Sequence, residues 1–257
     1  MIILVISLSA MMLLLLLLLF LTRRRAANIE RLLDHETIQM ERLQRTFEQF
    51  APPDVVEKLS DVSQSFQPTR RSVTVLFADL VGFTPMSEKL DPAVTVEIIN
   101  GYFQRMTQVI STHQGRVTEL IGDGLLALFG AMENNPWQVR DAVLAALEMR
   151  GVLEAYNEHL RAKSLPLLKF GVGIHHGEVI AGIMGNANLS KFAVVGDTVN
   201  LAARVEGLTR LHGVDILVTE EVRSHLDPQF QLEAMPPVEV KGKSQPVVTF
   251  HVKSLVS

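Results

Sequence analysis

Two aspartates stand beside predicted β-strands, where acidic side chains can converge on a cation. Asp79 follows the β-rich stretch 73–78, and Asp123 lies in a Gly-Asp-Gly turn between the stretches 116–121 and 125–129. Each has an ordinary explanation when taken alone, because Asp-Gly is a favoured hairpin turn and a strand-end aspartate often caps a helix. Together, paired carboxylates are the hard oxygen ligands that divalent cations prefer, with water and phosphate as the remaining ligands.

Two glycine-containing segments are candidates for binding phosphate. The segment 80–84, Leu-Val-Gly-Phe-Thr, directly follows Asp79, and its glycine can turn backbone amides toward a triphosphate. It is not a P-loop, since the chain contains no Gly-x-x-x-x-Gly-Lys-Ser/Thr pattern. Near the end of the chain, Lys241 and Lys243 flank a glycine, where they can either grip terminal phosphates or form a soluble turn.

An amide and a guanidinium follow at helical spacing. Asn200 and Arg204 are four residues apart, so they share one face of the helix predicted at 197–209. A neutral donor beside a guanidinium suits an oxygen-rich ligand: Asn200 could orient a ribose and Arg204 could stabilise charge on a transferring phosphorus. Taken in isolation, a solvated arginine and a capping asparagine explain the same pattern.

The elements that must hold these residues follow the order β-α-β-β-α-β. Strands are expected at 72–78, 116–121, 125–129 and 170–174, with one helix opening at Asp91-Pro92 and a second running from Asn135-Pro136 to about His159. This order is typical of a ferredoxin-like α+β fold, an antiparallel sheet with helices on one side. The first helix should bury a face that contains Val96, Ile99, Phe103, Met106 and Ile110. Further strands are expected at 192–195, 216–219, 238–241 and 247–252.

The first 22 residues predict a single-pass transmembrane helix. The segment 1–21 contains no charge and is long enough to span a bilayer, which needs ~20 apolar residues. A cleaved signal peptide is the alternative, but there the basic cluster precedes the apolar core, whereas Arg23, Arg24 and Arg25 follow it. The positive-inside rule then places the rest of the chain in the cytoplasm, at the inner membrane. The abrupt start at Met1 also fits the tail of a longer sensor.

The segment 23–69 predicts a cytoplasmic coiled-coil or helical connector, with one catalytic domain at 70–257. Seven residues recur at steps of four and three, the period of a coiled-coil seam: Ile29, Leu33, Glu36, Met40, Leu43, Phe47 and Phe50. A single amphipathic helix would give a similar stripe. Pro52-Pro53 ends the helix, because proline lacks the amide donor.

Composition excludes several classes of protein. A net charge of −4 gives no basic face for DNA or RNA, and the absence of cysteine excludes disulfides, thiolate zinc sites and cysteine nucleophiles. Any metal must therefore be held by oxygen or imidazole. His175 and His176 are neighbours on a predicted strand and must point to opposite faces, so they are not a chelating pair.

Four segments resemble, in order, the signatures of the class III adenylate and guanylate cyclases of bacterial type. These are Phe-Ala-Asp-Leu-Val-Gly-Phe-Thr at 77–84, Ile-Gly-Asp-Gly at 121–124, Gly-Asp-Thr-Val-Asn at 196–200 with Arg204, and Val-Lys-Gly-Lys at 240–243. The resemblance covers residues 70–252. It implies that Asp79 and Asp123 bind two Mg²⁺ or Mn²⁺ ions, that Phe83, Thr84 and Lys241 contact the substrate phosphates, and that Asn200 and Arg204 act on the ribose and the transition state.

The resemblance further implies the reaction and the assembly. The ribose 3′-hydroxyl of ATP or GTP attacks the α-phosphorus and releases pyrophosphate, forming a 3′,5′-cyclic monophosphate. The metal carboxylates and the Asn/Arg pair at one nucleotide come from different subunits, so a homodimer is expected, with the coiled-coil seam pairing the chains.

The base stays open between adenine and guanine. Adenylate-selective relatives carry a lysine where this chain has Glu119, and an aspartate or threonine where it has Ala193. A carboxylate can accept from both guanine N1–H and the exocyclic amine, which favours GTP. Ala193 offers no polar contact, so a loose ATP cyclase in which Glu119 forms only a salt bridge is equally compatible. Lys191 is the nearest candidate for a basic residue that relatives often carry beside the phosphates, in an unsettled register.

Two other classes compete with an active cyclase. A catalytically silent nucleotide-binding or dimerisation module would not need both aspartates, Asn200, Arg204 and Lys241 in one chain. A palm-type phosphotransferase shares the sheet and the paired carboxylates, but it does not account for Asn200, Arg204 or Lys241.

Overall fold

The computed structural model describes residues 68–186 and 189–256. The predicted transmembrane helix at 1–22 and nearly all of the predicted connector at 23–69 lie outside these residues. Within them, no helix combines the length and apolarity needed to cross a bilayer. The described residues belong to one compact unit, Phe66–Ser257.

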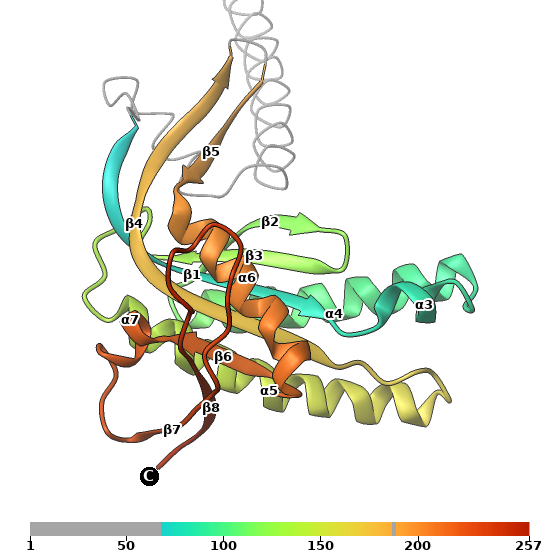
Figure 1. The fold of residues 1–257 in the computed structure, drawn as a ribbon. Coiled ribbons are helices and arrows are strands. Elements are labelled where there is room, and N and C mark those ends of the chain that lie inside the picture. Colours follow the sequence, from blue (N-terminus) through green and yellow to red (C-terminus); the bar gives the residue numbers. More distant parts are fainter. Residues whose placement is uncertain (1–67, 187–188, 257) are drawn as a thin grey trace, which may run out of the picture. The chain divides into compact units, whose positions relative to one another are not determined.

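The predicted βαββαβ unit is present in the predicted order (Figure 1). Its strands lie in the order β2-β3-β1-β4, which is the ferredoxin-like arrangement. A short helix, α3 (Phe83–Ser87), follows the first strand. The six elements of the unit are β1 (Thr69–Leu80), α4 (Pro92–Thr112), β2 (Arg116–Ile121), β3 (Gly124–Phe129), α5 (Gln138–Ala162) and β4 (Phe170–Asn186).

Further elements extend this unit to an eight-stranded sheet. The strand β6 pairs parallel to β4, so the sheet is mixed rather than wholly antiparallel as predicted, and β5 pairs with the far end of β4. The added elements are β5 (Leu189–Val195), α6 (Asp197–His212), β6 (Ile216–Thr219), α7 (Glu220–Arg223), β7 (Phe230–Ala234) and β8 (Thr249–Leu255).

One of the predicted terminal strands needs correction. The segment 238–241 forms only an isolated bridge, between Val238 and Val247, and the edge of the sheet is instead β7. An edge strand exposes one side, and in β7 only Phe230 is buried, so its alternation is weak in the sequence. Pro236 and Pro237 lack amide donors directly before 238–241, which disfavours a longer ladder there.

Helices cover both faces of the sheet, whereas the sequence predicted helices on one face only. Alternate side chains of β1 point to opposite faces, as the strand period requires. Leu76, Ala78 and Leu80 pack in the main apolar cluster with α4 and α5, while Val73 and Val75 pack in a second cluster with residues of α6. Figure 1 shows α6 on the opposite side of the sheet from α4 and α5. The expectation of helices on one side holds only for the first two.

The first long helix begins as predicted, but its buried face is rotated. Asp91 is the N-cap, and its carboxylate accepts a 2.8 Å hydrogen bond from the Ala93 amide. Val96 was expected to be buried, yet it is 54% exposed. The buried stripe is Ile98, Tyr102, Met106, Val109 and Ile110. Because two apolar stripes overlap on this helix, only packing decides which one turns inward.

Two glycines of β4 bring α6 very close to the sheet. A Cβ at Gly173 would lie 2.1 Å from the Glu206 amide nitrogen and 2.6 Å from the Ala202 carbonyl oxygen. A Cβ at Gly171 would lie 2.2 Å from the Thr209 hydroxyl oxygen. The backbone of α6 therefore rests directly on β4, and this contact fixes where the polar side chains of α6 emerge.

Candidate active site

The structure brings the two aspartates of the sequence together. Asp79 lies at the end of β1, and β1 pairs with β3 from Thr74–Phe129 to Ala78–Leu125, so the β2–β3 turn lies beside it. A carboxylate oxygen of Asp79 is 3.0 Å from where a Cβ of Gly124 would stand, next to Asp123. Partial burial and the negative charge of Asp79 both raise the pKa of Asp123. The two carboxylates therefore interact electrostatically at one end of the sheet.

Two residues of α6 join this pair, and the sequence did not single them out. Arg210 donates a hydrogen bond to Asp79, and the same guanidinium nitrogen lies 3.6 Å from a carboxylate oxygen of Glu206. Burial raises the pKa of Glu206 to about 7, with Arg210 opposing and the charges of Asp79 and Asp123 adding to the rise. The only signal in the sequence was an acid and a base four residues apart, directly after Arg204.

The acidic pair fits a hard divalent cation. The atoms that Asp79 and Asp123 offer as metal ligands are all carboxylate oxygens, and Arg210 offsets only part of the negative charge of the pair. Among residues 68–186 and 189–256, no three His, Cys, Asp or Glu side chains are grouped so as to hold a metal. A cation at Asp79 and Asp123 would therefore need water or phosphate as further ligands, as a nucleotide-binding metal usually does.

The amide and the guanidinium predicted to meet the substrate lie together on α6. Asn200 is exposed, and Arg204 is partly buried. The guanidinium nitrogens of Arg204 lie 3.5 and 3.6 Å from the position of a Cβ at Gly242, whose φ of +81° favours glycine. Nη1 of Arg204 is buried and has no hydrogen-bond partner within the described part of the chain. A buried, unpartnered guanidinium N–H is suited to an anionic or oxygen-rich ligand.

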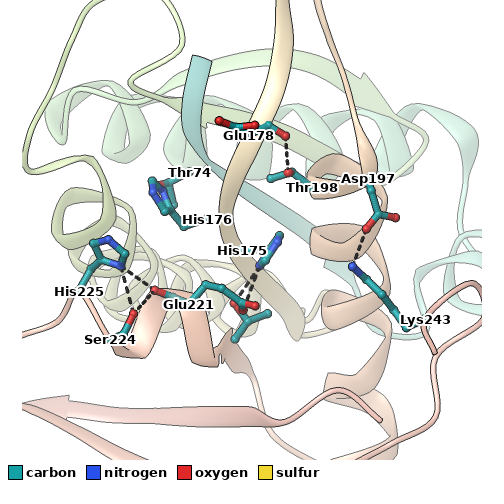
Figure 2. Close-up of polar contacts among 11 residues, drawn as sticks. Thr74, His175, His176, Glu178, Asp197, Thr198, Glu221, Ser224, His225 and Lys243 are labelled. Atoms are coloured by element: carbon teal, nitrogen blue, oxygen red, sulfur yellow. Dashed lines mark hydrogen bonds and ion pairs between the residues drawn. The ribbon is translucent and has the colours of Figure 1, made fainter. Parts of the chain in front are cut away.

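The predicted lysine loop is attached to the start of α6. The Lys243 ammonium donates a 2.5 Å hydrogen bond to the Asp197 carboxylate (Figure 2), and this contact lowers the pKa of Asp197. Lys241 is exposed on the same loop. Lys243 is thus used to hold the loop, which leaves Lys241 as the residue able to reach a phosphate.

Asn200 and Arg204 leave α6 on a different face from Glu206 and Arg210. At 3.6 residues per turn, the mean directions of the two pairs differ by roughly 120° around the helix axis. Glu206 and Arg210 face Asp79. A single chain therefore does not direct Asn200 and Arg204 at its own aspartates.

The predicted phosphate turn has the backbone that its glycine suggested. Gly82 has a φ of +71°, and the preceding Val81 amide donates a 2.8 Å hydrogen bond to the Lys169 carbonyl. The side chain of Phe83 packs against the main apolar cluster, so only its backbone can serve a ligand. Thr84 is exposed at the start of α3.

The two candidates for reading the base lie on separate strands. Val117 pairs with Ala127 and Glu119 pairs with Leu126, so β2 carries a bulge at residue 118. Residues paired across two strands share a face, and Leu126 belongs to the cluster on the α6 side, so Glu119 also lies on that side. Ala193 lies in β5, and β3, β1 and β4 stand between β2 and β5 in the sheet. Lys191 also lies in β5, with its side chain outside the described residues.

The adjacent histidines point to opposite faces, as predicted. Figure 2 shows His175 and His176 on opposite sides of β4. Nδ1 of His175 is hydrogen-bonded to the Thr219 hydroxyl at 2.9 Å, and its Nε2 lies 3.4 Å from where a Cβ of Gly177 would stand. His176 instead is bonded to the Thr74 hydroxyl at 2.9 Å. Burial lowers the pKa of His175 to about 4, so the ring is neutral at pH 7.

Sequence comparison connects this geometry to known proteins. Residues 65–254 match the family model described as the adenylate and guanylate cyclase catalytic domain. An adenylate cyclase of Anabaena cylindrica is 32% identical over 232 residues, which are 84% of this chain and 45% of that protein. Retinal guanylyl cyclase 1 of Rattus norvegicus is 29% identical over 226 residues, 85% of this chain and 20% of that protein. The chain thus spans less than half the length of these curated relatives.

Solved structures show the same likeness. The guanylyl cyclase Cya2 superposes with a TM-score of 0.69 and 34% identity, covering 73% of this chain and 94% of that one. The adenylyl cyclase CyaB from P. aeruginosa also gives a TM-score of 0.69, with 25% identity over 73% of this chain and 96% of that one. Adenylyl and guanylyl cyclases are therefore both among the similar structures.

Proposed function

This chain belongs to the adenylate and guanylate cyclase catalytic-domain family, and from that premise we propose that it converts ATP or GTP to the 3′,5′-cyclic monophosphate and pyrophosphate. The observation that carries the proposal is the convergence of Asp79 and Asp123, together with a helix that carries Asn200 and Arg204 on one face. The competing function is a silent nucleotide-binding module, which would not require both the aspartate pair and the Arg204 guanidinium.

The role of each residue follows from its charge and position. Asp79 and Asp123 would hold two Mg²⁺ or Mn²⁺ ions, which when bound would acidify the ribose 3′-hydroxyl and neutralise the phosphates. Asn200 orients the ribose through its amide. Arg204 supplies guanidinium donors to the charge that develops on the α-phosphate, and its buried Nη1 is free of other partners within the described residues.

The loop 240–243 positions Lys241, the remaining positively charged side chain of the proposed site. The ion pair between Lys243 and Asp197 attaches this loop to α6, which carries Asn200 and Arg204. Gly242 lies beside the Arg204 guanidinium, so the backbone of its neighbour Lys241 is also close to Arg204. Lys241 then contacts the terminal phosphates and assists departure of pyrophosphate.

A homodimer would complete each site. Asn200 and Arg204 lie on a different face of α6 from the residues that face their own chain's aspartates, so a second chain would place the four residues around one nucleotide. The seam at residues 29–50 would hold the two chains together, and the apolar segment 1–21 would anchor them in the inner membrane with the catalytic domain in the cytoplasm.

Identification of the product by mass tests the function. The full chain is incubated with ATP or GTP and Mn²⁺, and we expect a cyclic monophosphate and pyrophosphate from at least one nucleotide. Asp79→Asn should remove this activity, whereas Asp227→Asn, at an exposed aspartate outside the site, should leave it unchanged. Binding of nucleotide without any cyclic product would instead support the silent module.

A further inference from the structure

The guanidinium of Arg210 lies against the acidic pair Asp79 and Asp123, where the proposed metal cation would bind. Its guanidinium donates to one carboxylate oxygen of Asp79 and lies 3.6 Å from Glu206. Its positive charge also lowers the pKa of Asp123, so it acts on both aspartates. A divalent cation bound to Asp79 would be repelled by this guanidinium, so the two cations compete for the carboxylate.

Glu206 provides a second acceptor for the same guanidinium. It is only 8% exposed, and its Oε1 has no hydrogen-bond partner among the described residues. The same Oε1 is the atom 3.6 Å from Arg210. A Cβ at Gly171 would lie 2.8 Å from this oxygen, so the glycine leaves room for the carboxylate beneath α6. A buried carboxylate oxygen without a donor is costly, and this cost favours capture of a nearby donor.

Arg210 has space to exchange between these two acceptors. Its side chain is 43% exposed. It also lines a cavity of about 630 Å³ between α5, α6 and the end of β1, shared with Val81, Lys169 and Asp215. The same guanidinium nitrogen already lies 3.6 Å from Glu206, so transfer from Asp79 needs only a short movement of a side chain that borders open space.

We propose that Arg210 is an internal counter-cation that pairs with Asp79 in the metal-free protein and transfers to Glu206 when a divalent cation binds Asp79 and Asp123. This inference rests on the cation site of the proposed function. Arg210 then competes with the metal, and Glu206 assists metal binding by accepting Arg210. Neither residue touches the substrate, so both act through the occupancy of the cation site.

Binding of Mn²⁺ alone to the full chain, measured as free Mn²⁺ by electron paramagnetic resonance at constant pH, tests this exchange. Arg210→Ala removes the competitor, and we expect at least roughly threefold tighter binding, the range of a partly exposed ion pair. Glu206→Gln removes the negative charge that would hold the guanidinium but keeps the shape, so Mn²⁺ binding should weaken by a similar factor. In the Arg210→Ala background, Glu206→Gln should have no effect.

The double variant separates exchange from simple electrostatics. If the charge of Glu206 acted directly on the metal ion, Glu206→Gln would weaken Mn²⁺ binding equally in both backgrounds, which would overturn the proposal. Unchanged or weaker binding by Arg210→Ala would overturn it as well. Arg161→Ala, which removes an exposed arginine from an (i, i+3) ion pair on α5, should not change the affinity.

Asp79→Asn distinguishes failure of this inference from failure of the function. It should abolish the Mn²⁺ binding that the other variants modulate, with circular dichroism confirming that each variant is folded. If Asp79→Asn leaves Mn²⁺ binding intact, the proposed cation site is wrong and the exchange fails with it. If Asp79→Asn abolishes binding while the Arg210 variants do not alter it, only the exchange is wrong.

Discussion

Glu119 reaches the α6 side of the sheet because of one extra residue. Side chains two apart on a regular strand share a face, so without the bulge Glu119 would follow Val117 toward α4 and α5. The bulge instead aligns Glu119 with Leu126, on the side where α6 carries the candidate catalytic residues. A single backbone irregularity thus decides on which face of the sheet this carboxylate lies.

The choice of base is predicted to follow Glu119. A carboxylate accepts from guanine N1–H and the exocyclic amine, whereas adenine offers an acceptor at N1. Glu119→Lys with Ala193→Asp should raise the ratio of kcat/KM for ATP over GTP by at least roughly tenfold, the effect of one well-placed polar contact. Steady-state kinetics with both nucleotides measures this ratio. The charge-neutral change Leu120→Ala, at an exposed neighbour, serves as control, and an equal change there would contradict the assignment.

His175 should make stability depend on pH. Burial lowers its pKa to about 4 in the folded protein, while in the unfolded chain an imidazole titrates near about 6.5. Between these values the unfolded chain binds a proton that the folded protein does not, so stability falls as the pH falls, by up to about 1.4 kcal/mol per pH unit.

Urea denaturation at pH 7 and at pH 5 measures this dependence. His175→Asn keeps a nitrogen near the Thr219 hydroxyl but cannot titrate, so the loss of unfolding free energy between the two pH values should become smaller. The exposed His159→Asn on α5 should keep the wild-type dependence. An unchanged dependence in His175→Asn would show that other groups cause it.

At the scale of elements, the contact between α6 and β4 decides where the site forms. Gly173→Ala would place a methyl group 2.1 Å from the Glu206 amide, against backbone that cannot move aside. We expect it to lower the unfolding free energy by at least about 2 kcal/mol, as overpacking does, and to reduce Mn²⁺ binding by shifting α6. Chemical denaturation and calorimetric titration measure the two effects.

Gly207→Ala on the same helix is the matched control. A Cβ at Gly207 has no neighbour within 4 Å, so the substitution should stabilise the protein by up to about 1 kcal/mol through helix propensity. If Gly173→Ala were equally harmless, α6 could move away from β4, and the close contact would not be what positions Glu206 and Arg210.

At the scale of the whole molecule, shared sites should be visible in mixtures of inactive variants. Asp79→Ala and Arg204→Ala should each lower turnover by at least roughly 100-fold, as loss of a charge-stabilising group does. A random mixture of the two contains half heterodimers, each with one intact site, so about a quarter of the wild-type turnover should return. Assays of cyclic product before and after mixing measure this recovery.

Asp79→Ala mixed with Asp123→Ala provides the matched comparison. One chain contributes both aspartates to a site, so no heterodimer contains an intact site and no activity should return. Recovery in this second mixture, or none in the first, would contradict a site built from two chains.

Local information in the sequence determined the acidic pair Asp79 and Asp123, the pair Asn200 and Arg204 on one helix, and the order of the six elements of the βαββαβ unit. Asp79 and Asp123 follow strand ends whose β-rich composition is evident, and Asp91-Pro92 gives an unambiguous helix start. The four ordered motifs predicted the family, which comparison with known cyclases confirmed. Residue types and spacings sufficed because each of these features depends on neighbours within a few positions.

Only the tertiary structure decided which faces and partners these residues take. The buried stripe of α4, the bulge that turns Glu119, the placement of α6 on the second face and the edge strand β7 all depend on packing between distant segments. Glu206 and Arg210 looked like an ordinary ion pair on a helix surface. They became part of the site because two glycines of β4 admit the backbone of α6, and no pattern within α6 could reveal that contact.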